Sequence, residues 1–173
     1  MRVLVTGVKG QLGYDVVNEL KKRNHEVIGM DVDEMDVTNE SVVKRVIGEA
    51  KPDAVIHCAA WTAVDAAEEP ENAAKAMKIN ADGTKYIAEA CRKTDAKMMY
   101  ISTDYVFDGQ GEEPWQPDCK AYAPLNVYGE SKLNGEKAVE ALLEKYYIVR
   151  IAWVFGKNGN NFCLLYTSPS PRD

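Results

Sequence analysis

The sequence is poor in cysteine and lacks both a long apolar run and a surplus of basic residues. Its 173 residues include four cysteines, no two of them spaced as a metal-binding or redox motif: Cys58, Cys91, Cys119 and Cys163. Such sparse cysteines favour a reduced, cytoplasmic protein in which Cys58 and Cys91 are core thiols. No apolar stretch approaches the ~20 residues of a membrane-spanning helix. The first apolar run, VLV, stops at once in TGVKG, so no signal peptide is expected.

The charge balance excludes two classes of partner. The chain carries 21 Lys and Arg against 27 Asp and Glu, a net charge of -6. Nucleic acids and anionic membrane surfaces are bound through clustered Lys and Arg, so neither is expected as a partner. With 46% hydrophobic and 28% charged residues, the composition is typical of one globular domain with a core.

Apolar runs and stretches with helical spacing alternate along the chain. Strands are expected at residues 2–7, 25–31, 52–60, 97–103 and 146–156, and helices at residues 11–24, 38–51, 72–94 and 126–146. The strands are nearly continuous apolar runs, as in parallel sheets that helices cover on both faces. The sequence therefore predicts an α/β fold, a Rossmann-type doubly wound parallel sheet.

Three glycines lie in TGVKGQLG, between the first strand and the first helix. Gly7, Gly10 and Gly13 would let the backbone turn tightly and approach a pyrophosphate, to which the helix offers its N–H groups and positive dipole end. Glycine also serves plain turns. The strand before and the helix after this turn favour dinucleotide binding.

Asp31 ends the second strand about 20 residues beyond the glycine turn, where a carboxylate commonly binds the ribose of adenosine. It would repel a 2′-phosphate, and no arginine follows it, so NADH is mildly favoured over NADPH. A solvated strand-end aspartate is the competing interpretation. Asp36 and Val37 are suited to flank the adenine. Ala59 and Ala60 would let the cofactor pass close to the backbone, although small residues also serve tight helix packing.

Tyr128 and Lys132 lie four residues apart in NVYGESKLNGEK, on one face of a predicted helix. On its own, this pair could be two ordinary surface residues. Beside a dinucleotide, the lysine ammonium would lower the tyrosine pKa from its usual ~10 by stabilising the phenolate. Tyr128 could then exchange a proton with a carbonyl oxygen while Lys132 holds the nicotinamide ribose. Thr103, at the end of the fourth strand, could bond the substrate oxygen or simply cap the strand.

Together these stretches resemble the extended short-chain dehydrogenase/reductases. The matching segments run from residue 3 to residue 162: VTGVKGQLG, DVTN, PDAVIHCAAWTAVDAAE, INADGT, ISTDYVFDG, PLNVYGESKLNGE and RIAWVFGKNGNNF. STDYVFDG and NVYGESKLNGE are specific to the branch that reduces dTDP-linked 4-dehydro sugars. The tyrosine–lysine pair alone marks only the superfamily.

The resemblance implies a reaction and a set of site residues. NADH or NADPH would reduce dTDP-4-dehydro-L-rhamnose to dTDP-L-rhamnose, with Tyr128 as proton donor to the C4 carbonyl, Lys132 as its tuner and ribose ligand, and Thr103 assisting. The implied binding residues are Gly10, Gln11 and Leu12 for the pyrophosphate, Asp31 for the ribose, Asp36 and Val37 for the adenine, Ala59, Ala60 and Thr62 for the cofactor groove, and Asp104 and Trp153 for the sugar nucleotide.

The resemblance also bears on partners and metals. A dTDP-sugar is the implied substrate, and members of this branch are often homodimers. Some bind magnesium through C-terminal residues that have no counterpart here, so no metal site is predicted.

The family pattern stops at GNNF, and CLLYTSPSPRD follows. Residues 1–162 are expected to form the NAD(P)-binding Rossmann domain and residues 163–173 a foreign or disordered tail, since Pro169 and Pro171 bar a helix. The chain is then a fragment truncated before most of the substrate-binding lobe. A genuine Ser/Pro-rich disordered end is the rival interpretation.

Two other functions remain open. One is another sugar-nucleotide epimerase or dehydratase. Dehydratases typically place acidic residues beside the active-site threonine, and Asp104 fits, but Tyr105 stands where a second acid is expected. The other is a non-catalytic regulatory subunit of the same fold, like that of methionine adenosyltransferase. Joint retention of Thr103, Tyr128 and Lys132 favours an enzyme.

Overall fold

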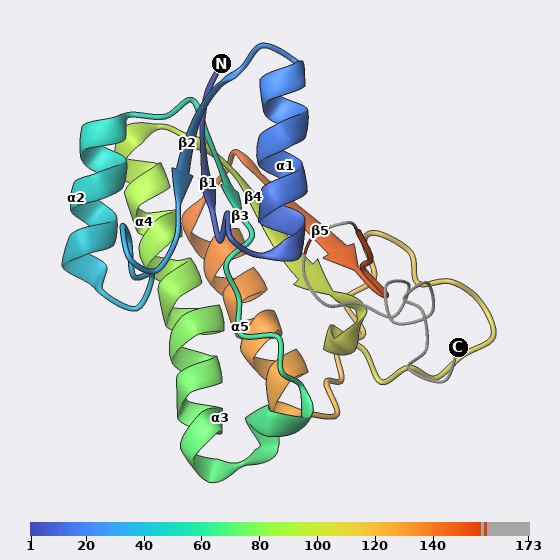
Figure 1. Cartoon of the computed structure of the whole chain (residues 1–173). Helices are drawn as coiled ribbons and strands as arrows, with labels where there is room; N and C mark the ends of the chain where they lie inside the picture. The colour runs from blue at the N-terminus through green and yellow to red at the C-terminus, as the bar shows by residue number, and fades with distance from the viewer. Residues whose placement is uncertain (157, 159–173) are drawn as a thin grey trace, which may run out of the picture.

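The computed structural model describes residues 1–156 and 158, and its centre is a parallel five-stranded sheet in the order β2-β1-β3-β4-β5 (Figure 1). The strands are β1 (Arg2–Thr6), β2 (Glu26–Met30), β3 (Ala54–His57), β4 (Lys97–Thr103) and β5 (Tyr146–Ile151). The helices are α1 (Gln11–Lys22), α2 (Glu40–Ala50), α3 (Pro70–Met77), α4 (Thr84–Thr94) and α5 (Val127–Leu142), with shorter turns η1 (Asp65–Glu68), η2 (Lys78–Gly83) and η3 (Asp104–Val106). The predicted Rossmann-type doubly wound sheet is confirmed.

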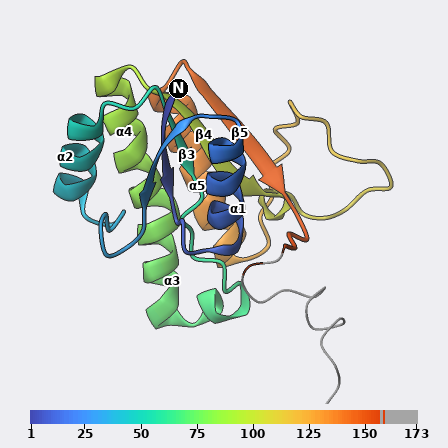
Figure 2. The ribbon, with the colours of Figure 1, turned by 45° about the horizontal axis from the view of Figure 1, so that its top comes forward.

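Helices cover both faces of the sheet. α1 packs on one face against β1 and β2, whereas α2, α4 and α5 lie side by side on the other (Figures 1 and 2). β1 pairs with β2 along one edge and with β3 along the other, so the direction of strand addition reverses between β1 and β3. In open sheets of this kind the ligand crevice lies at such a reversal, outside the carboxyl ends of the strands.

The main core lies between the sheet and the layer of α2, α4 and α5. Leu4, Val55 and Met98, one from each central strand, are fully buried against Ile47 of α2 and Ile87 of α4. Burying a side chain of this size stabilises the fold by about 1.5–3 kcal/mol. These contacts fix the strand ends that carry the site residues.

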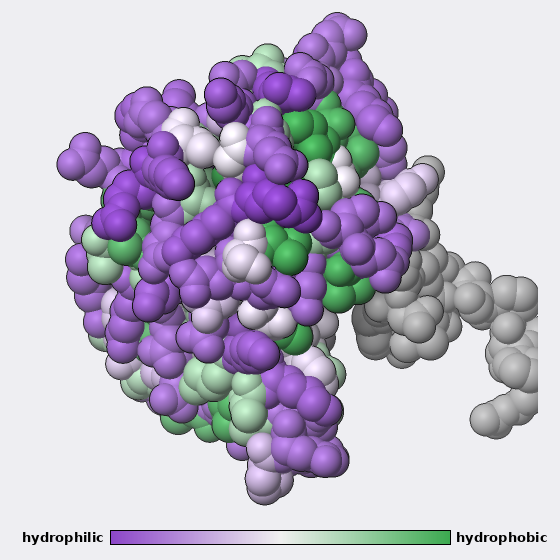
Figure 3. Space-filling view, turned by 90° about the vertical axis from the view of Figure 1, so that its left-hand side faces the viewer, coloured by the Kyte–Doolittle hydropathy of each residue, from purple (hydrophilic) through white to green (hydrophobic). Residues whose placement is uncertain are grey.

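The surface is largely polar. Figure 3 shows the side of the molecule that carries α2, where hydrophilic residues dominate and hydrophobic ones form separate small patches. Within the described part of the chain, no helix has the length and apolar character needed to cross a membrane.

The helix predicted over residues 72–94 is interrupted. α3 and α4 are joined by η2, a π-helical segment in which Asn80 and Gly83 are buried. The Asn80 amide accepts a hydrogen bond from Trp61 N at 2.9 Å and donates to Trp61 O at 3.1 Å and Ser131 Oγ at 2.9 Å. These tertiary bonds hold the wider turn, and helical periodicity carries no sign of them. Such π segments often occur at functional sites.

The boundaries predicted for the last helix and strand are too long. α5 ends at Leu142, and β5 ends at Ile151 instead of residue 156. The backbone at Trp153 has φ 52°, a left-handed conformation that ends the extended run. The tail predicted over residues 163–173 lies outside the described residues.

A buried polar chain runs from the sheet to α4 through His57. The His57 ring lies 2.7 Å from Thr6 Oγ1 through Nδ1 and 3.1 Å from Thr84 Oγ1 through Nε2, and it stacks on Tyr100. Burial, assisted by the charge of Lys132, lowers the pKa of His57 to about 3. His57 is therefore neutral in the folded protein at neutral pH.

This buried histidine should make the fold sensitive to mild acid. Between about pH 6.5 and 3 the unfolded chain binds a proton that folded His57 does not, so stability falls as the pH drops. At pH 5 the expected loss is about 2 kcal/mol. Urea unfolding at pH 7 and pH 5 should show this loss in the wild type and not in His57→Gln. The control His25→Gln, at a partly exposed site, should behave as the wild type, and equal losses in all three would contradict the prediction.

Candidate active site

A cavity of about 980 Å³ opens at the carboxyl ends of the strands. It is lined by the glycine turn, the ends of β2, β3, β4 and β5, and the first turns of α5. The structure brings together every residue predicted to bind the cofactor: Gly7, Gly10, Gln11, Leu12, Asp31, Asp36, Val37, Ala59, Ala60, Thr62, Tyr128 and Lys132. Asp104 and Trp153, the predicted sugar-nucleotide contacts, also line this cavity.

The glycine turn leaves a cradle that a side chain would fill. Gly7 has φ +68°, and a Cβ there would meet the backbone of Ala59 at 2.8 Å. A Cβ on Gly13 would lie 2.1 Å from Gly7 O, so only glycine lets α1 approach the turn this closely. α1 begins without a side-chain cap and without an acid in its first turn. This arrangement suits a pyrophosphate at the helix N-terminus.

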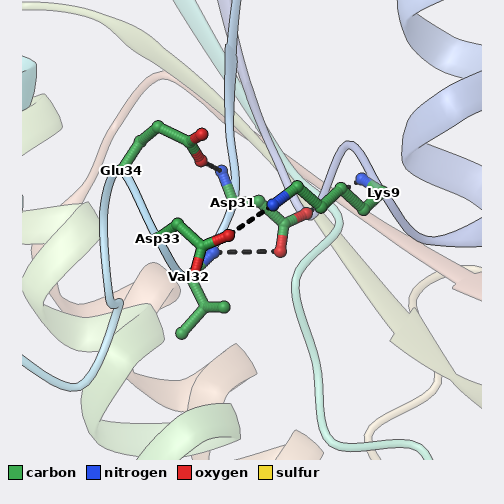
Figure 4. Close-up of polar contacts among 5 residues, drawn as sticks. All are labelled: Lys9, Asp31, Val32, Asp33 and Glu34. Atoms are coloured by element: carbon green, nitrogen blue, oxygen red, sulfur yellow. Dashed lines mark hydrogen bonds and ion pairs between the residues drawn. The ribbon is translucent and has the colours of Figure 1, made fainter.

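Asp31 is held at the edge of the cavity by backbone donors. Its carboxylate accepts hydrogen bonds from Lys9 N at 2.8 Å and Val32 N at 2.9 Å. The Lys9 ammonium pairs with Asp33, and Glu34 accepts from Asp31 N at 3.0 Å (Figure 4). One lysine therefore stands among three carboxylates, and its charge is directed to Asp33.

Tyr128 is placed by the tight start of α5. Asn126 caps the helix, its Oδ1 accepting from Gly129 N at 2.7 Å. A Cβ on Gly129 would lie 2.2 Å from Tyr105 O, so glycine lets the helix rest directly on η3. The Tyr128 and Tyr105 rings meet edge to face at 5.8 Å. The phenol is thereby fixed beside the end of β4.

Lys132 is buried under the cavity wall. Its Nζ donates to Ile101 O at 2.7 Å and lies 4.2 Å from the centroid of the Tyr100 ring. Burial lowers the pKa of Lys132 to about 7, and the charge of Glu136 opposes this shift. At neutral pH the lysine is therefore poised between its two protonation states.

The lowered pKa predicted for Tyr128 is wrong for the protein alone. Burial raises the pKa of this phenol, while a hydrogen bond with Thr103 lowers it and the charge of Asp104 raises it. The expected effect of Lys132 is not among these causes, since its Nζ is directed to Ile101 O. Tyr128 is consequently a protonated phenol at neutral pH, the form required of a proton donor.

Thr103 lies behind the cavity wall. It is buried, and its Oγ1 accepts from Tyr105 N at 3.2 Å and donates to Asp104 Oδ1 at 3.1 Å. Strand-end capping, the alternative role of this residue, is thus present together with the bond to Tyr128. Trp153, two residues beyond the β5 residue that pairs with Thr103, is 89% exposed.

Sequence reasoning missed Ser102, Cys58 and Asn80. Ser102 lines the cavity, and its Oγ is buried without a hydrogen-bond partner in the described part of the chain. Cys58 also lines the cavity, and burial raises its thiol pKa to about 12, so it stays protonated. Ser102 could have been inferred from its place at the end of β4. Asn80 lies in the matching segment INADGT, but its role depends on contacts with Trp61 and with Ser131 of α5, which the sequence pattern does not show.

Comparison with known proteins decides the family. The family model described as the RmlD substrate binding domain matches residues 1–168. The chain belongs to the RmlD family. The predicted kinship with extended short-chain dehydrogenase/reductases is confirmed by this match and by the relatives below.

Several relatives of this RmlD chain are named dTDP-4-dehydrorhamnose reductase, whereas another, from Streptomyces niveus, is named dTDP-4-keto-6-deoxy-D-glucose reductase. The chain is 43% identical over 163 residues to a dTDP-4-dehydrorhamnose reductase of Streptomyces griseus, covering 93% of this chain and 52% of the relative. The Escherichia coli K12 dTDP-4-dehydrorhamnose reductase is 41% identical over 167 residues, with coverage of 94% and 54%. The chain therefore spans about half the length of the curated relatives it matches.

Solved structures agree with the RmlD assignment. A Clostridium acetobutylicum dTDP-4-dehydrorhamnose reductase superposes with a TM-score of 0.88 at 48% identity, covering 94% of this chain and 56% of that one. The Bacillus anthracis reductase, solved in complex with NADP, gives a TM-score of 0.89 at 44% identity, with coverage of 93% and 56%. The fold that positions the cavity is thus shared with these reductases.

Proposed function

We propose that the chain provides the cofactor site and the proton donor of a dTDP-4-dehydrorhamnose reductase, with residues 1–162 as the dinucleotide-binding domain. The observation that carries the proposal is that Tyr128 and Lys132 lie on the wall of the same 980 Å³ cavity as the glycine turn. The names and identities of the relatives support the substrate, dTDP-4-dehydro-L-rhamnose. The site of action would be the cytoplasm, where NADH and NADPH are available.

The residues of the cavity fit NADH or NADPH. The glycine cradle suits the pyrophosphate, and Asp31 suits the adenosine ribose. Ser102 Oγ, buried and unpartnered among the described residues, suits a polar group at the nicotinamide end. The cofactor, when bound, supplies the hydride that reduces the C4 carbonyl carbon.

Tyr128 would give its phenolic proton to the C4 oxygen while the C4 carbon accepts the hydride. The raised pKa keeps the phenol protonated until the carbonyl oxygen gains negative charge. Thr103 holds the phenol, and the Lys132 ammonium would stabilise the phenolate left behind and bind the nicotinamide ribose. Asp104 and Trp153 would contact the sugar nucleotide.

Turnover tests this function in a protein that extends the chain to the full length of its relatives, because the chain spans about half of that length. With dTDP-4-dehydro-L-rhamnose, NADH absorbance should fall and one dTDP-L-rhamnose should form for each NADH consumed. Product formed without net NADH consumption would indicate an epimerase or dehydratase. NADH binding without product would reject the reductase and support the alternative of a non-catalytic binding protein.

Asp33→Asn is expected to shift the ratio of the Kd values for NADPH and NADH in favour of NADPH by roughly twofold to fivefold. A change of this size corresponds to the free energy of one exposed ion pair. Asp33 holds the Lys9 ammonium and adds negative charge beside the ribose end (Figure 4). Its neutralisation frees Lys9 for a 2′-phosphate. Calorimetric titration of both cofactors at low salt gives the ratio of their Kd values.

Glu26→Gln is the matched control for this substitution. Glu26 is an exposed acid paired with Arg2 at the opposite end of β2, so its loss should leave the Kd ratio unchanged. The same ratio in Asp33→Asn and Glu26→Gln would remove Asp33 from cofactor discrimination.

A further inference from the structure

A buried ion pair joins α5 to β5. The Glu136 carboxylate is 1% exposed and accepts two hydrogen bonds from the Arg150 guanidinium, from Nε to Oε1 at 2.9 Å and from Nη2 to Oε2 at 2.7 Å. Arg150 Nη2 also donates to Tyr122 Oη at 2.9 Å, and the guanidinium lies over the rings of Phe107 and Tyr122. Such a bidentate pair fixes a buried carboxylate in place.

Glu136 follows Lys132 by one helical turn, so both project from the same side of α5. Lys132 is 2% exposed, with Ile101 O and the face of the Tyr100 ring as its contacts. A carbonyl and an aromatic ring compensate only part of the cost of burying an ammonium ion. The negative charge of Glu136, one helical turn away, is therefore well placed to offset the rest of the cost of burying the Lys132 ammonium ion.

Most titratable groups around Lys132 carry no charge at neutral pH. On β3 burial lowers the pKa of His57 to about 3, and just after β3 burial raises that of Cys58 to about 12. Burial also raises the pKa of Tyr100 on β4. Among residues 1–156 and 158, the other groups near this region are the neutral phenol of Tyr128 on α5, Asp104 on η3 and Arg150 on β5. Asp104 acts on Tyr128, and Arg150 is bound by Glu136.

We propose that Glu136 is a positioning residue of the reductase site, whose buried carboxylate favours the ammonium form of Lys132, with Arg150 holding that carboxylate in place. The inference rests on the proposed function, since it assigns the charge on Lys132 to the task of binding ribose and stabilising the Tyr128 phenolate. Neither Glu136 nor Arg150 is part of the described cavity lining, so both act through Lys132.

The proposal makes the protonation of Lys132 depend on a residue remote from the ligands. Burial alone would shift the pKa of Lys132 below the value of about 7, and the Glu136 charge opposes that shift. Without this charge the lysine would be largely neutral at neutral pH. The pH above which the site loses its ammonium would then move in the acid direction.

The test is a titration of Lys132 itself, followed by NMR of its Cε and Nζ resonances in the full chain and assigned with Lys132→Met. We expect a midpoint near pH 7 in the wild type. In Glu136→Gln, which keeps the shape and removes the charge, the midpoint should fall by about one pH unit or more. In Glu136→Asp, which keeps the negative charge but moves it closer to the α5 backbone, the midpoint should lie between those of the wild type and Glu136→Gln.

Tyr122→Phe is the matched control. It removes one hydrogen bond from the same Arg150 network without changing any charge, so the midpoint should stay near pH 7. A wild-type midpoint in a folded Glu136→Gln would overturn the proposal, as would an equal shift in Tyr122→Phe. Where Glu136→Gln does not fold, an unshifted midpoint in Glu136→Asp would overturn the proposal in the same way.

This readout separates the inference from the proposed function, because the titration needs neither cofactor nor substrate. Midpoint shifts in the chain, together with no NADH consumption after its extension to the full length of the relatives, would uphold the role of Glu136 as a charge partner and reject the reductase. NADH consumption with unshifted midpoints would uphold the reductase and reject the role of Glu136. In an active chain, the alkaline limb of the turnover profile should move by the same amount as the midpoint.

Discussion

In a protein that extends the chain to the full length of its relatives, the Tyr128→Phe variant is expected to lose turnover by about 10²- to 10⁴-fold, the usual contribution of a positioned proton donor. The substitution removes the phenolic O–H and keeps the ring that packs against Tyr105 at 5.8 Å. The Kd for NADH should therefore stay close to that of the wild type. Steady-state NADH oxidation and a direct NADH titration measure the two effects separately.

Tyr147→Phe is the control for this loss. Tyr147 is an exposed tyrosine on β5, so removing its hydroxyl should leave turnover unchanged. Undiminished turnover in Tyr128→Phe would exclude Tyr128 as the proton donor. A parallel loss of NADH binding would show instead that the hydroxyl serves the cofactor.

Gly13→Ala is expected to weaken NADH binding by at least about tenfold and to lower the free energy of unfolding by about 1–3 kcal/mol. The added Cβ would lie 2.1 Å from Gly7 O and 2.7 Å from Gly7 C, a clash with backbone that no side-chain movement relieves. Either α1 or the glycine turn must shift, and the pyrophosphate cradle shifts with it. NADH titration and urea unfolding report the two effects.

Gly48→Ala is the matched control for Gly13→Ala, because Gly48 is also a helical glycine and lies in α2. A Cβ at Gly48 would meet nothing within 4 Å, so this variant should gain roughly 0.5–1 kcal/mol of stability and bind NADH normally. If Gly13→Ala binds NADH as tightly as Gly48→Ala does, the glycine turn is not the pyrophosphate site.

The sheet and the cofactor wall could be predicted because they depend on local patterns. The buried strands are continuous apolar runs, and parallel pairing brings their carboxyl ends to one edge, so Asp31 and Ala59 meet the glycine turn there. Gly13 is needed for a contact with Gly7 within the same turn, and both glycines were visible as a motif.

Other features depend on contacts between distant segments and could not be predicted. The π segment is held by bonds from Asn80 to Trp61 and Ser131, which periodicity does not encode. The raised pKa of Tyr128 follows from the depth of its burial, and the pairing of Glu136 with Arg150 from the approach of β5 to α5. Burial and partner geometry of this kind exist only in the folded chain.

A crystal structure of the chain with NADH bound tests the proposed site most directly. The pyrophosphate should lie on the cradle of Gly10, Gln11 and Leu12, and the nicotinamide should lie beside Tyr128 with its ribose hydroxyls on the Lys132 ammonium. NADH bound elsewhere, or seated in the cavity with its nicotinamide turned away from Tyr128 and Lys132, would contradict the proposed reductase site.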